Sequence, residues 1–559
     1  MLISFYILSS LFVQLKCYVE VNIKQGVIIG VKEMTLFEQK WYYAFYGVPY
    51  AKPPVARLRF QNPKPLTRFS KPFDATTEYH GACAQAHIVH KHALYGYEDC
   101  LHLNIYTPHL PQDNKQNLKP VIVWIHGYAF TSSFSHVYGS DFLIEHDVLF
   151  ISLTHRIGAF GFLKLNESDP NSNMGLRDII TGLKWIRNNV KYFGGDKKQI
   201  TLMGGGSGAT LASLLLLTKY RKLFQKIIIQ SGSMFSPSLY QDYNTLEASK
   251  FEKEIKKAGY KDHMTAPTIA LVTASNKIYS SKDIINSQRP IVPFKPSIGK
   301  INFDEYENSN NEKFDIPILA GLSTQESLSE ALPFIHNPSY LKYLGKYFKY
   351  MVPFLNGCSY NDTTKSFTTI AGKIKQRYFK KYPDIALQEF LKYTSDIHKY
   401  PIFKFIKTHV KNNNRKVFVY KFNYVGNFNV MKSTSLAGIQ TKVKGAAHGD
   451  ESCYVLKCEP LWENYVKIKD DVDNRDRRFI KQIAKMWANF AKFGDPTPAN
   501  YGGNITWLPM TEREDNLLLI QKHTKMIDSK SETGMFNFWN KIYRDYYSQE
   551  HCSNVHDEL

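Results

Sequence analysis

The chain has 559 residues, of which 43% are hydrophobic and 14% aromatic, so it has ample material for a large buried core. Its 71 Lys and Arg against 50 Asp and Glu give a formal net charge of +21. The sequence contains no basic helix interleaved with aromatics, no zinc-ligand spacing and no nucleic-acid module. These features exclude a disordered or nucleic-acid-binding chain, and we expect a soluble globular protein that needs no metal or cofactor.

The first segment has the character of a signal peptide. Residues 2–15 are almost wholly apolar or small, and the run is too short to span a bilayer comfortably. Cleavage after the small residue Cys17 is compatible with such a segment, which would remove residues 1–17. The alternative is a buried first strand. No later segment has the length and apolarity of a membrane span.

The next part of the chain alternates β-branched runs with amphipathic helices. Buried strands are expected at 121–125 and 148–152, a helix at 175–190, a strand at 199–203 and an apolar helix at 209–217. Later elements repeat this pattern, with strands at 227–229, 316–319 and 417–420 and a helix at 476–492. The order predicts an α/β fold built on a mostly parallel, doubly wound sheet.

Two stretches interrupt the alternation. Residues 240–310 and 340–412 have weaker periodicity and many Lys and Tyr residues. We expect them to be insertions that cover the C-terminal edge of the sheet, where ligands of such folds bind.

The last four residues, His556 to Leu559, read HDEL. A receptor recognises this tail and returns its bearers to the endoplasmic reticulum. We therefore expect a signal peptide at 1–17, one domain at 18–551 and a tail at 552–559, in a protein that resides in the lumen of the endoplasmic reticulum. The retrieval receptor is then one expected partner.

An oxidising lumen permits disulfides and glycosylation. Six cysteines remain after removal of the signal peptide: Cys83, Cys100, Cys358, Cys453, Cys458 and Cys552. Three sequons begin at Asn166, Asn361 and Asn504 and predict glycosylation at an exposed surface.

Six motifs follow one another along the chain: Phe45-Tyr-Gly-Val-Pro-Tyr50, Glu98-Asp-Cys-Leu-His-Leu-Asn104, Asn173-Met-Gly-Leu-Arg-Asp178, Phe193-Gly-Gly-Asp196, Gln230-Ser-Gly-Ser233 and Phe490-Ala-Lys-Phe-Gly-Asp-Pro496. In sequence and in order they resemble the type-B carboxylesterase and cholinesterase family, and the resemblance spans about residues 22 to 545. The resemblance implies the α/β-hydrolase fold and a machinery for hydrolysing carboxylic esters.

The resemblance also implies several structural pairs. Cys83 and Cys100 match the first disulfide of the family, and Arg59 with Glu98 and Arg156 with Asp178 match its buried ion pairs. The other four cysteines do not follow the usual second bridge. Cys453 and Cys458 are close enough in sequence to pair, but other combinations stay open.

Ester hydrolysis on this fold needs a nucleophile on a strained elbow, an acid and a histidine, in that chain order. The resemblance places the acid at Glu326, within Gly321-Leu-Ser-Thr-Gln-Glu326, and the histidine at His448, within Gly445-Ala-Ala-His-Gly-Asp450. The elbow is Gly204-Gly-Gly-Ser-Gly208, so the nucleophile position is Gly206. Glycine has no oxygen with which to attack a carbonyl.

Ser207 could replace the lost nucleophile only if the turn slipped by one residue. That register would put Ala209 where close packing requires a glycine. In the expected register, Ser207 contributes its backbone N–H to the oxyanion hole, together with Tyr128 and Ala129.

The oxyanion loop carries a second departure from the family. It reads His126-Gly-Tyr-Ala-Phe130, with Tyr128 in place of a glycine, and loss of one oxyanion donor costs about 10²–10³ in rate. We expect Tyr128 to fill the pocket that the substrate would use. The segment between Cys83 and Cys100 has no Trp to hold a quaternary ammonium, which argues against a choline ester.

Three functions remain. The first is a catalytically inactive luminal protein, similar to the neuroligin branch in which glycine also occupies the nucleophile position, that binds a luminal protein partner. The second is an active carboxylic ester hydrolase. The third is a binder of a small ester or lipid-like ligand that keeps the pocket without turnover.

Overall fold

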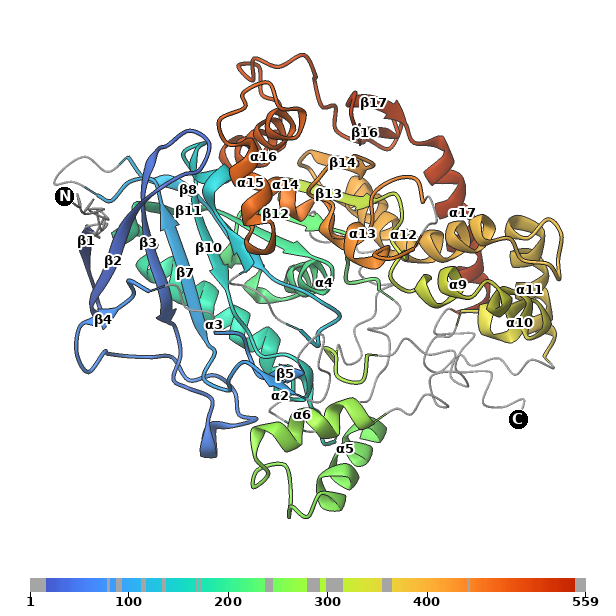
Figure 1. Ribbon diagram of the computed structural model, residues 1–559, viewed down its shortest axis with the longest axis horizontal. Helices are drawn as coiled ribbons and strands as arrows, with labels where there is room; N and C mark the ends of the chain where they lie inside the picture. The colour runs from blue at the N-terminus through green and yellow to red at the C-terminus, as the bar shows by residue number, and fades with distance from the viewer. Residues whose placement is uncertain are drawn as a thin grey trace, which may run out of the picture.

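In the computed structural model, one large twisted sheet runs through the molecule, with helices on both faces (Figure 1). The structure describes residues 17–77, 81–86, 93–111, 117–132, 137–166, 169, 172–236, 245–278, 292–297, 315–353, 364–439 and 443–547. Most of the proposed signal peptide, the HDEL tail, Cys358, Cys552 and the sequon asparagine Asn361 therefore lie outside the described residues.

The sheet has 13 strands in the order β1-β2-β3-β7-β10-β8-β11-β12-β13-β14-β16-β17, and β4 pairs with β2. The strands are β1 (Tyr18–Ile23), β2 (Gly26–Met34), β3 (Trp41–Pro49), β4 (Phe73–Asp74), β7 (His102–Thr107), β8 (Lys119–Ile125), β10 (Leu149–Leu153), β11 (Gly195–Gly205), β12 (Lys226–Gln230), β13 (Ile318–Ser323), β14 (Val417–Phe422), β16 (Asn516–Ile520) and β17 (Lys525–Asp528). Pairing is parallel from β10 through β16 along this order, and the strands at both edges pair antiparallel.

Two short two-stranded sheets lie apart from the main one, β5 (Gln85–Ala86) with β6 (Leu94–Tyr95) and β9 (Tyr138–Gly139) with β15 (Lys457–Cys458). The helices are α1 (Asp141–Ile144), α2 (Gly158–Phe162), α3 (Met174–Asn189), α4 (Ser207–Leu214), α5 (Thr245–Lys257), α6 (Thr268–Lys277), α9 (Leu332–His336), α10 (Ser339–Lys346), α11 (Lys365–Tyr378), α12 (Leu387–Asn412), α13 (Val430–Ser435), α14 (Ser452–Val455), α15 (Trp462–Ile468), α16 (Arg475–Phe493) and α17 (Lys530–Tyr546). In the described part of the chain, no helix is both long and apolar enough to cross a membrane.

Strand β8 shows why the sheet is buried on both faces. Side chains alternate along a strand, and Val121, Val123 and Ile125 pack in one core with α3 and α4, whereas Ile122 and Trp124 pack in a second core with α16. Because both sets are apolar, the strand is a continuous hydrophobic run, as is typical of parallel strands covered on both sides.

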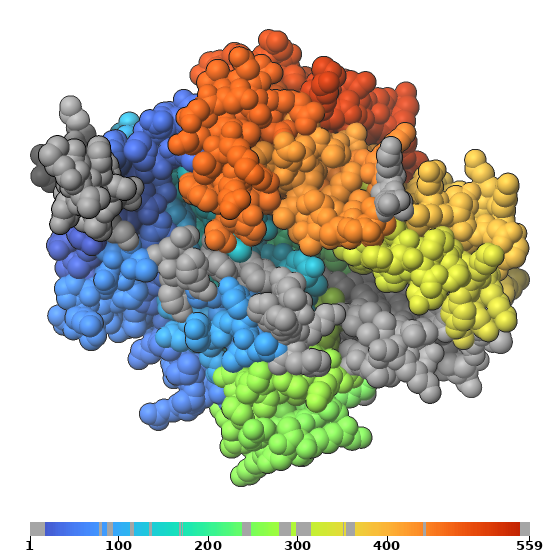
Figure 2. Space-filling model, in the orientation of Figure 1, coloured from blue at the N-terminus to red at the C-terminus, as the bar shows by residue number. Residues whose placement is uncertain are grey.

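The two predicted insertions form helical lobes. Figure 2 shows α5 and α6 at the lower edge of the molecule and α9 to α11 at its right edge. Helix α12 crosses the C-terminal edge of the sheet, where the Ser233 hydroxyl, just after β12, donates to the carbonyl of Pro401 at 2.7 Å. This contact agrees with the prediction that the second insertion covers that edge.

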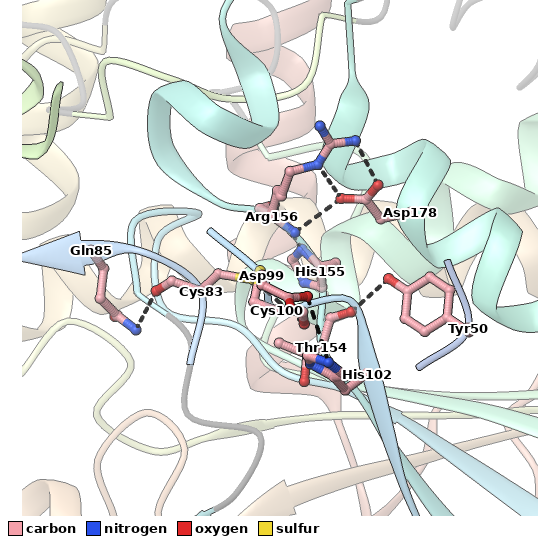
Figure 3. Close-up of a disulfide and its surroundings, with 10 residues drawn as sticks. All are labelled: Tyr50, Cys83, Gln85, Asp99, Cys100, His102, Thr154, His155, Arg156 and Asp178. Atoms are coloured by element: carbon pink, nitrogen blue, oxygen red, sulfur yellow. Dashed lines mark hydrogen bonds and ion pairs between the residues drawn. A yellow bond between two sulfur atoms is a disulfide. The ribbon is translucent and has the colours of Figure 1, made fainter. Parts of the chain in front are cut away.

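The pairs implied by the family resemblance are confirmed. A disulfide joins Cys83 to Cys100, and Arg156 makes a fully buried, two-pronged ion pair with Asp178, with its shortest N–O distance 2.7 Å (Figure 3). The guanidinium of Arg59 pairs with Glu98 at the same distance. The second bridge, left open by the sequence, joins Cys453 to Cys458.

Candidate active site

The nucleophile position lies on a sharp turn between β11 and α4. Strand β11 ends at Gly205 and α4 begins at Ser207, so Gly206 alone makes the turn, with φ 54° and ψ −121°. An L-residue rarely adopts this backbone conformation, and it is the strained geometry of a nucleophile elbow.

The two flanking glycines fix the register of this turn. A Cβ on Gly204 would lie 2.5 Å from the backbone of Gly208, and a Cβ on Gly208 would lie 2.2 Å from the carbonyl oxygen of Ile125. Both distances are far shorter than real Cβ contacts, so neither position accepts a side chain without backbone movement. Slippage by one residue would place Ala209 in the second of these contacts. Gly206 is therefore the central residue of the elbow.

The other half of the machinery is assembled from two distant segments. Glu326 lies just after β13, and His448 lies in the loop before α14. The Nδ1 of His448 is 2.6 Å from Oε2 of Glu326. The other carboxylate oxygen, Oε1, accepts hydrogen bonds from the hydroxyl of Ser231 at 2.7 Å and from the backbone N–H of Ser323.

This pair carries opposite charges at neutral pH. Burial alone would favour the uncharged imidazole, but the carboxylate of Glu326 outweighs it and raises the pKa of His448 to about 9. Burial would likewise raise the pKa of Glu326, but the imidazolium and the hydrogen bonds from Ser231 and Ser323 hold that pKa below its usual value. The Glu326 side chain is buried, whereas 39% of the His448 side chain is exposed.

The elbow and the histidine converge. A Cβ placed on Gly206 would lie 3.0 Å from Nε2 of His448, and this is the nearest heavy atom to that point. The predicted residues Gly206, Glu326 and His448 are thus brought together in the order that the chemistry requires. Position 206 has no side-chain hydroxyl, and the imidazole lies closer to the elbow than a serine side chain there would comfortably allow.

Ser207 points elsewhere. Its hydroxyl accepts a hydrogen bond from the backbone N–H of Phe130 at 3.1 Å, and it would lie 2.8 Å from a Cβ on Gly127. Both contacts are with the oxyanion loop. The side chain of Ser207 therefore fastens the elbow to this loop and is not directed at His448.

The oxyanion loop packs directly on the elbow. A Cβ on Gly127 would come within 2.1 Å of the backbone nitrogen of Gly208, which explains why this position needs a glycine. Ala129 and Phe130 both have positive φ angles, of 50° and 59°, so the loop is tightly turned. Tyr128, between Gly127 and these two residues, has 49% of its surface exposed. That it fills the pocket which the substrate would use stays a prediction.

Sequence reasoning missed a second acid–histidine pair next to the first. Nε2 of His398, on α12, is 2.9 Å from Oε2 of Glu330. The carboxylate of Glu330 acts to raise the pKa of His448. The charge of His448 in turn acts to lower the pKa values of Glu330 and His398. The hydroxyl of Ser327 holds the two segments together through Thr394. A lone histidine on a helix gives no sequence signal that it pairs with an acid far away in the chain. The bond from Ser231 was also missed, although its motif was recognised.

Two of the three predicted glycosylation sites fall within the described residues. Asn166 and Asn504 are exposed, as glycosylation would require.

A doubly wound sheet, a strand–turn–helix elbow and a histidine–glutamate pair on the following loops define an α/β-hydrolase. Residues 18–539 match the sequence model of the carboxylesterase family. The chain belongs to the carboxylesterase family.

Similar proteins are esterases by name. Esterase E4 of Myzus persicae is 29% identical over 95% of this chain and 98% of its own length. Juvenile hormone esterase of Tribolium castaneum is 26% identical over 92% of this chain and 90% of its own length. Among solved structures, juvenile hormone esterase of Manduca sexta, described with OTFP covalently attached, superposes with a TM-score of 0.78 at 24% identity, covering 94% of this chain and 100% of that one. This likeness supports the same fold.

Proposed function

We propose that this protein is a non-catalytic member of the carboxylesterase family that binds a small ester-like or lipid-like ligand, or a luminal protein, without turning over an ester. One observation carries the proposal. The residue that faces Nε2 of His448 on the elbow is Gly206, and the register of the turn is fixed by glycines on both sides. No side-chain oxygen is therefore available for attack on a carbonyl.

A second departure from an active site supports the same proposal, because the oxyanion loop carries Tyr128 where the family has a glycine.

Ester hydrolysis is the competing function, and the names of the relatives favour it. It would need Ser207 to act as the nucleophile. The hydrogen bond from Phe130 to the Ser207 hydroxyl counts against this role, because the turn would have to rearrange before that oxygen could reach the histidine.

The test is turnover of a short-chain aryl ester by the purified protein. The native protein and the variant Ser207→Ala should both be inactive, whereas Gly206→Ser combined with Tyr128→Gly should regain partial activity. Gly206→Ala combined with Tyr128→Gly is the matched control, because it adds the Cβ without an oxygen. Turnover by the native protein that disappears in Ser207→Ala would establish the competing function.

We further propose that the protein resides in the lumen of the endoplasmic reticulum through a signal peptide at 1–17 and the HDEL tail. The disulfides among the described residues, Cys83–Cys100 and Cys453–Cys458, and the exposed Asn166 and Asn504 support an oxidising, glycosylating compartment. A tagged chain ending in HDEL should be retained in cells, and one with the four residues deleted should appear in the medium. Equal retention of both would contradict the role of the tail.

A further inference from the structure

The lobe formed by α9 to α11 holds a large share of the protein's positive charge. Residues 331–383 contain nine Lys and Arg and a single acidic residue, so they carry +8 of the formal net charge of +21. The described part of this lobe, 331–353 and 364–383, contains no Asp or Glu. An anionic partner would therefore be drawn to this lobe, which forms the right edge of the molecule in Figure 2.

Helix α10 presents this charge together with aromatic rings. Tyr340, Tyr343 and Tyr347 follow one another at intervals of three and four residues, so they lie along one face of the helix and of the residue after it. Their exposed fractions are 49%, 47% and 36%. Lys342 and Lys346 are also exposed. This segment corrects the expectation that the sequence contains no basic helix interleaved with aromatics.

The packing of α10 keeps these side chains outside. Leu341 and Leu344 are buried against the rest of the lobe. A Cβ on Gly345 would lie 2.0 Å from the carbonyl oxygen of Pro383, and the hydroxyl of Tyr382 donates to the carbonyl of Gly345 at 2.7 Å. The helix thus lies directly on the segment that follows α11. Turning the tyrosines inward would break these contacts, so their exposure is a fixed feature of the lobe.

Ammonium groups and aromatic rings share one surface here. Nζ of Lys346 is 5.3 Å from the ring centroid of Tyr347, and Nζ of Lys375 is 3.9 Å from that of Tyr382. Tyr382 is itself exposed. The first acidic residue after α11 is Asp384, which is exposed at the border of this surface. The surface is therefore both aromatic and positively charged.

This combination fits the surface of an anionic phospholipid bilayer. Tyrosine favours the boundary of a bilayer, where its ring meets the acyl chains and its hydroxyl meets water. Each lysine beside acidic headgroups increases the affinity about fivefold. A soluble acidic protein would use the charge without needing protruding rings. A nucleic acid strand binds in a groove that follows its backbone, whereas these tyrosines lie on the outer surface of the lobe.

We infer that the lobe formed by α9 to α11 docks the protein on an anionic phospholipid bilayer. Tyr340, Tyr343 and Tyr347 enter the headgroup region, and Lys342 and Lys346 bind the acidic lipids. The inference is independent of the proposed function, because it uses no group of the candidate active site.

The test is flotation of the glycosylated full chain with vesicles of phosphatidylcholine, prepared with and without phosphatidylserine. The protein should bind the mixed vesicles only, and salt at about 1 M should release it because salt screens the charges. Failure to bind the mixed vesicles, or equal binding to both kinds, would overturn the inference. Binding to polyglutamate or to a short single-stranded oligonucleotide, with no binding to vesicles, would assign the lobe to a soluble acidic partner instead.

Paired variants test the lysines. Lys342→Gln combined with Lys346→Gln should weaken binding to the mixed vesicles about thirtyfold, since two charges are removed. The matched control is Lys197→Gln combined with Lys198→Gln, which removes the same charge from two exposed lysines near the start of β11. The control should change the affinity by less than about twofold, because those lysines lie far from the docked surface. Equal losses in the two pairs would overturn the inference.

Single tryptophans test whether the tyrosines enter the bilayer. Tyr343→Trp should show quenching by brominated phosphatidylcholine in mixed vesicles beyond that of the seven native tryptophans. Tyr18→Trp is the control, at an exposed position on β1 at the opposite end of the molecule (Figure 1), and should show no added quenching. Tyr340→Ala combined with Tyr343→Ala should weaken binding roughly tenfold. Thermal unfolding checks the fold of each variant. Added quenching at neither position, or at position 18 alone, would overturn the inference.

Discussion

The elbow and the acid–histidine pair differ in how much of the family's active-site pattern they retain. At the elbow, the backbone path is intact, with glycines at 204 and 208 in contacts that exclude a side chain, but the reactive atom is lost. In the pair, Glu326 and His448 retain both their identity and a 2.6 Å contact. The difference shows that neither the path of the elbow nor the acid–histidine contact depends on a side-chain oxygen at position 206.

The largest effect is expected at the rigid part of the elbow. The change Gly208→Ala places a Cβ 2.2 Å from the carbonyl oxygen of Ile125, and it should lower the free energy of unfolding by about 3 kcal/mol because both partners are backbone. Urea unfolding measures this. The control is Gly372→Ala, on the exposed face of α11 with no atom within 4 Å, which should stabilise the protein slightly. A neutral Gly208→Ala would mean that the register of the turn is not fixed as described.

The central residue of the elbow should respond less strongly. Gly206→Ala forces an L-residue into φ 54° and brings its Cβ to 3.0 Å from His448, so it should cost about 2 kcal/mol. The imidazole can retreat by a few tenths of an ångström, which limits the penalty. The same unfolding experiment applies, and an unchanged stability would indicate that the turn relaxes to an ordinary conformation.

The pair of Glu326 and His448 is best tested through the effect of the carboxylate on the pKa of the histidine. Glu326→Gln removes the main cause of the raised pKa of His448 and should bring that pKa down from about 9 toward the ordinary histidine range. Because His448 is partly exposed, the loss of stability should be modest, about 1.5 kcal/mol. Nuclear magnetic resonance titration of His448 gives the pKa. An unchanged value in the variant would show that Glu326 does not raise the pKa of His448.

The smallest effect is the dependence of stability on pH. The pKa of His448 is raised in the folded protein, so its contribution is fully present below the pKa of an unfolded histidine and is lost as the pH rises through about 9. The difference in stability between the native protein and Glu326→Gln should therefore shrink above that pH. A difference that grows with alkaline pH would contradict the ion pair.

Local periodicity predicted the parallel strands and the helices α3 and α16. The family resemblance gave Gly206, Glu326 and His448, which the structure brings together. Neither could predict the Glu330–His398 pair, whose members come from a loop and a distant helix. The positive φ angles of Ala129 and Phe130 were also beyond reach, since neither residue type favours that conformation. The pairing of Cys453 with Cys458 was one of several combinations that the sequence left open.

The most direct test of the account is the intact mass of the purified native protein after treatment with a fluorophosphonate, a reagent that labels activated serine hydroxyls. The account predicts no adduct on the native protein and a single adduct on Gly206→Ser at the new residue, with none on Gly206→Ala. An adduct on native Ser207 that is lost in Ser207→Ala would contradict it.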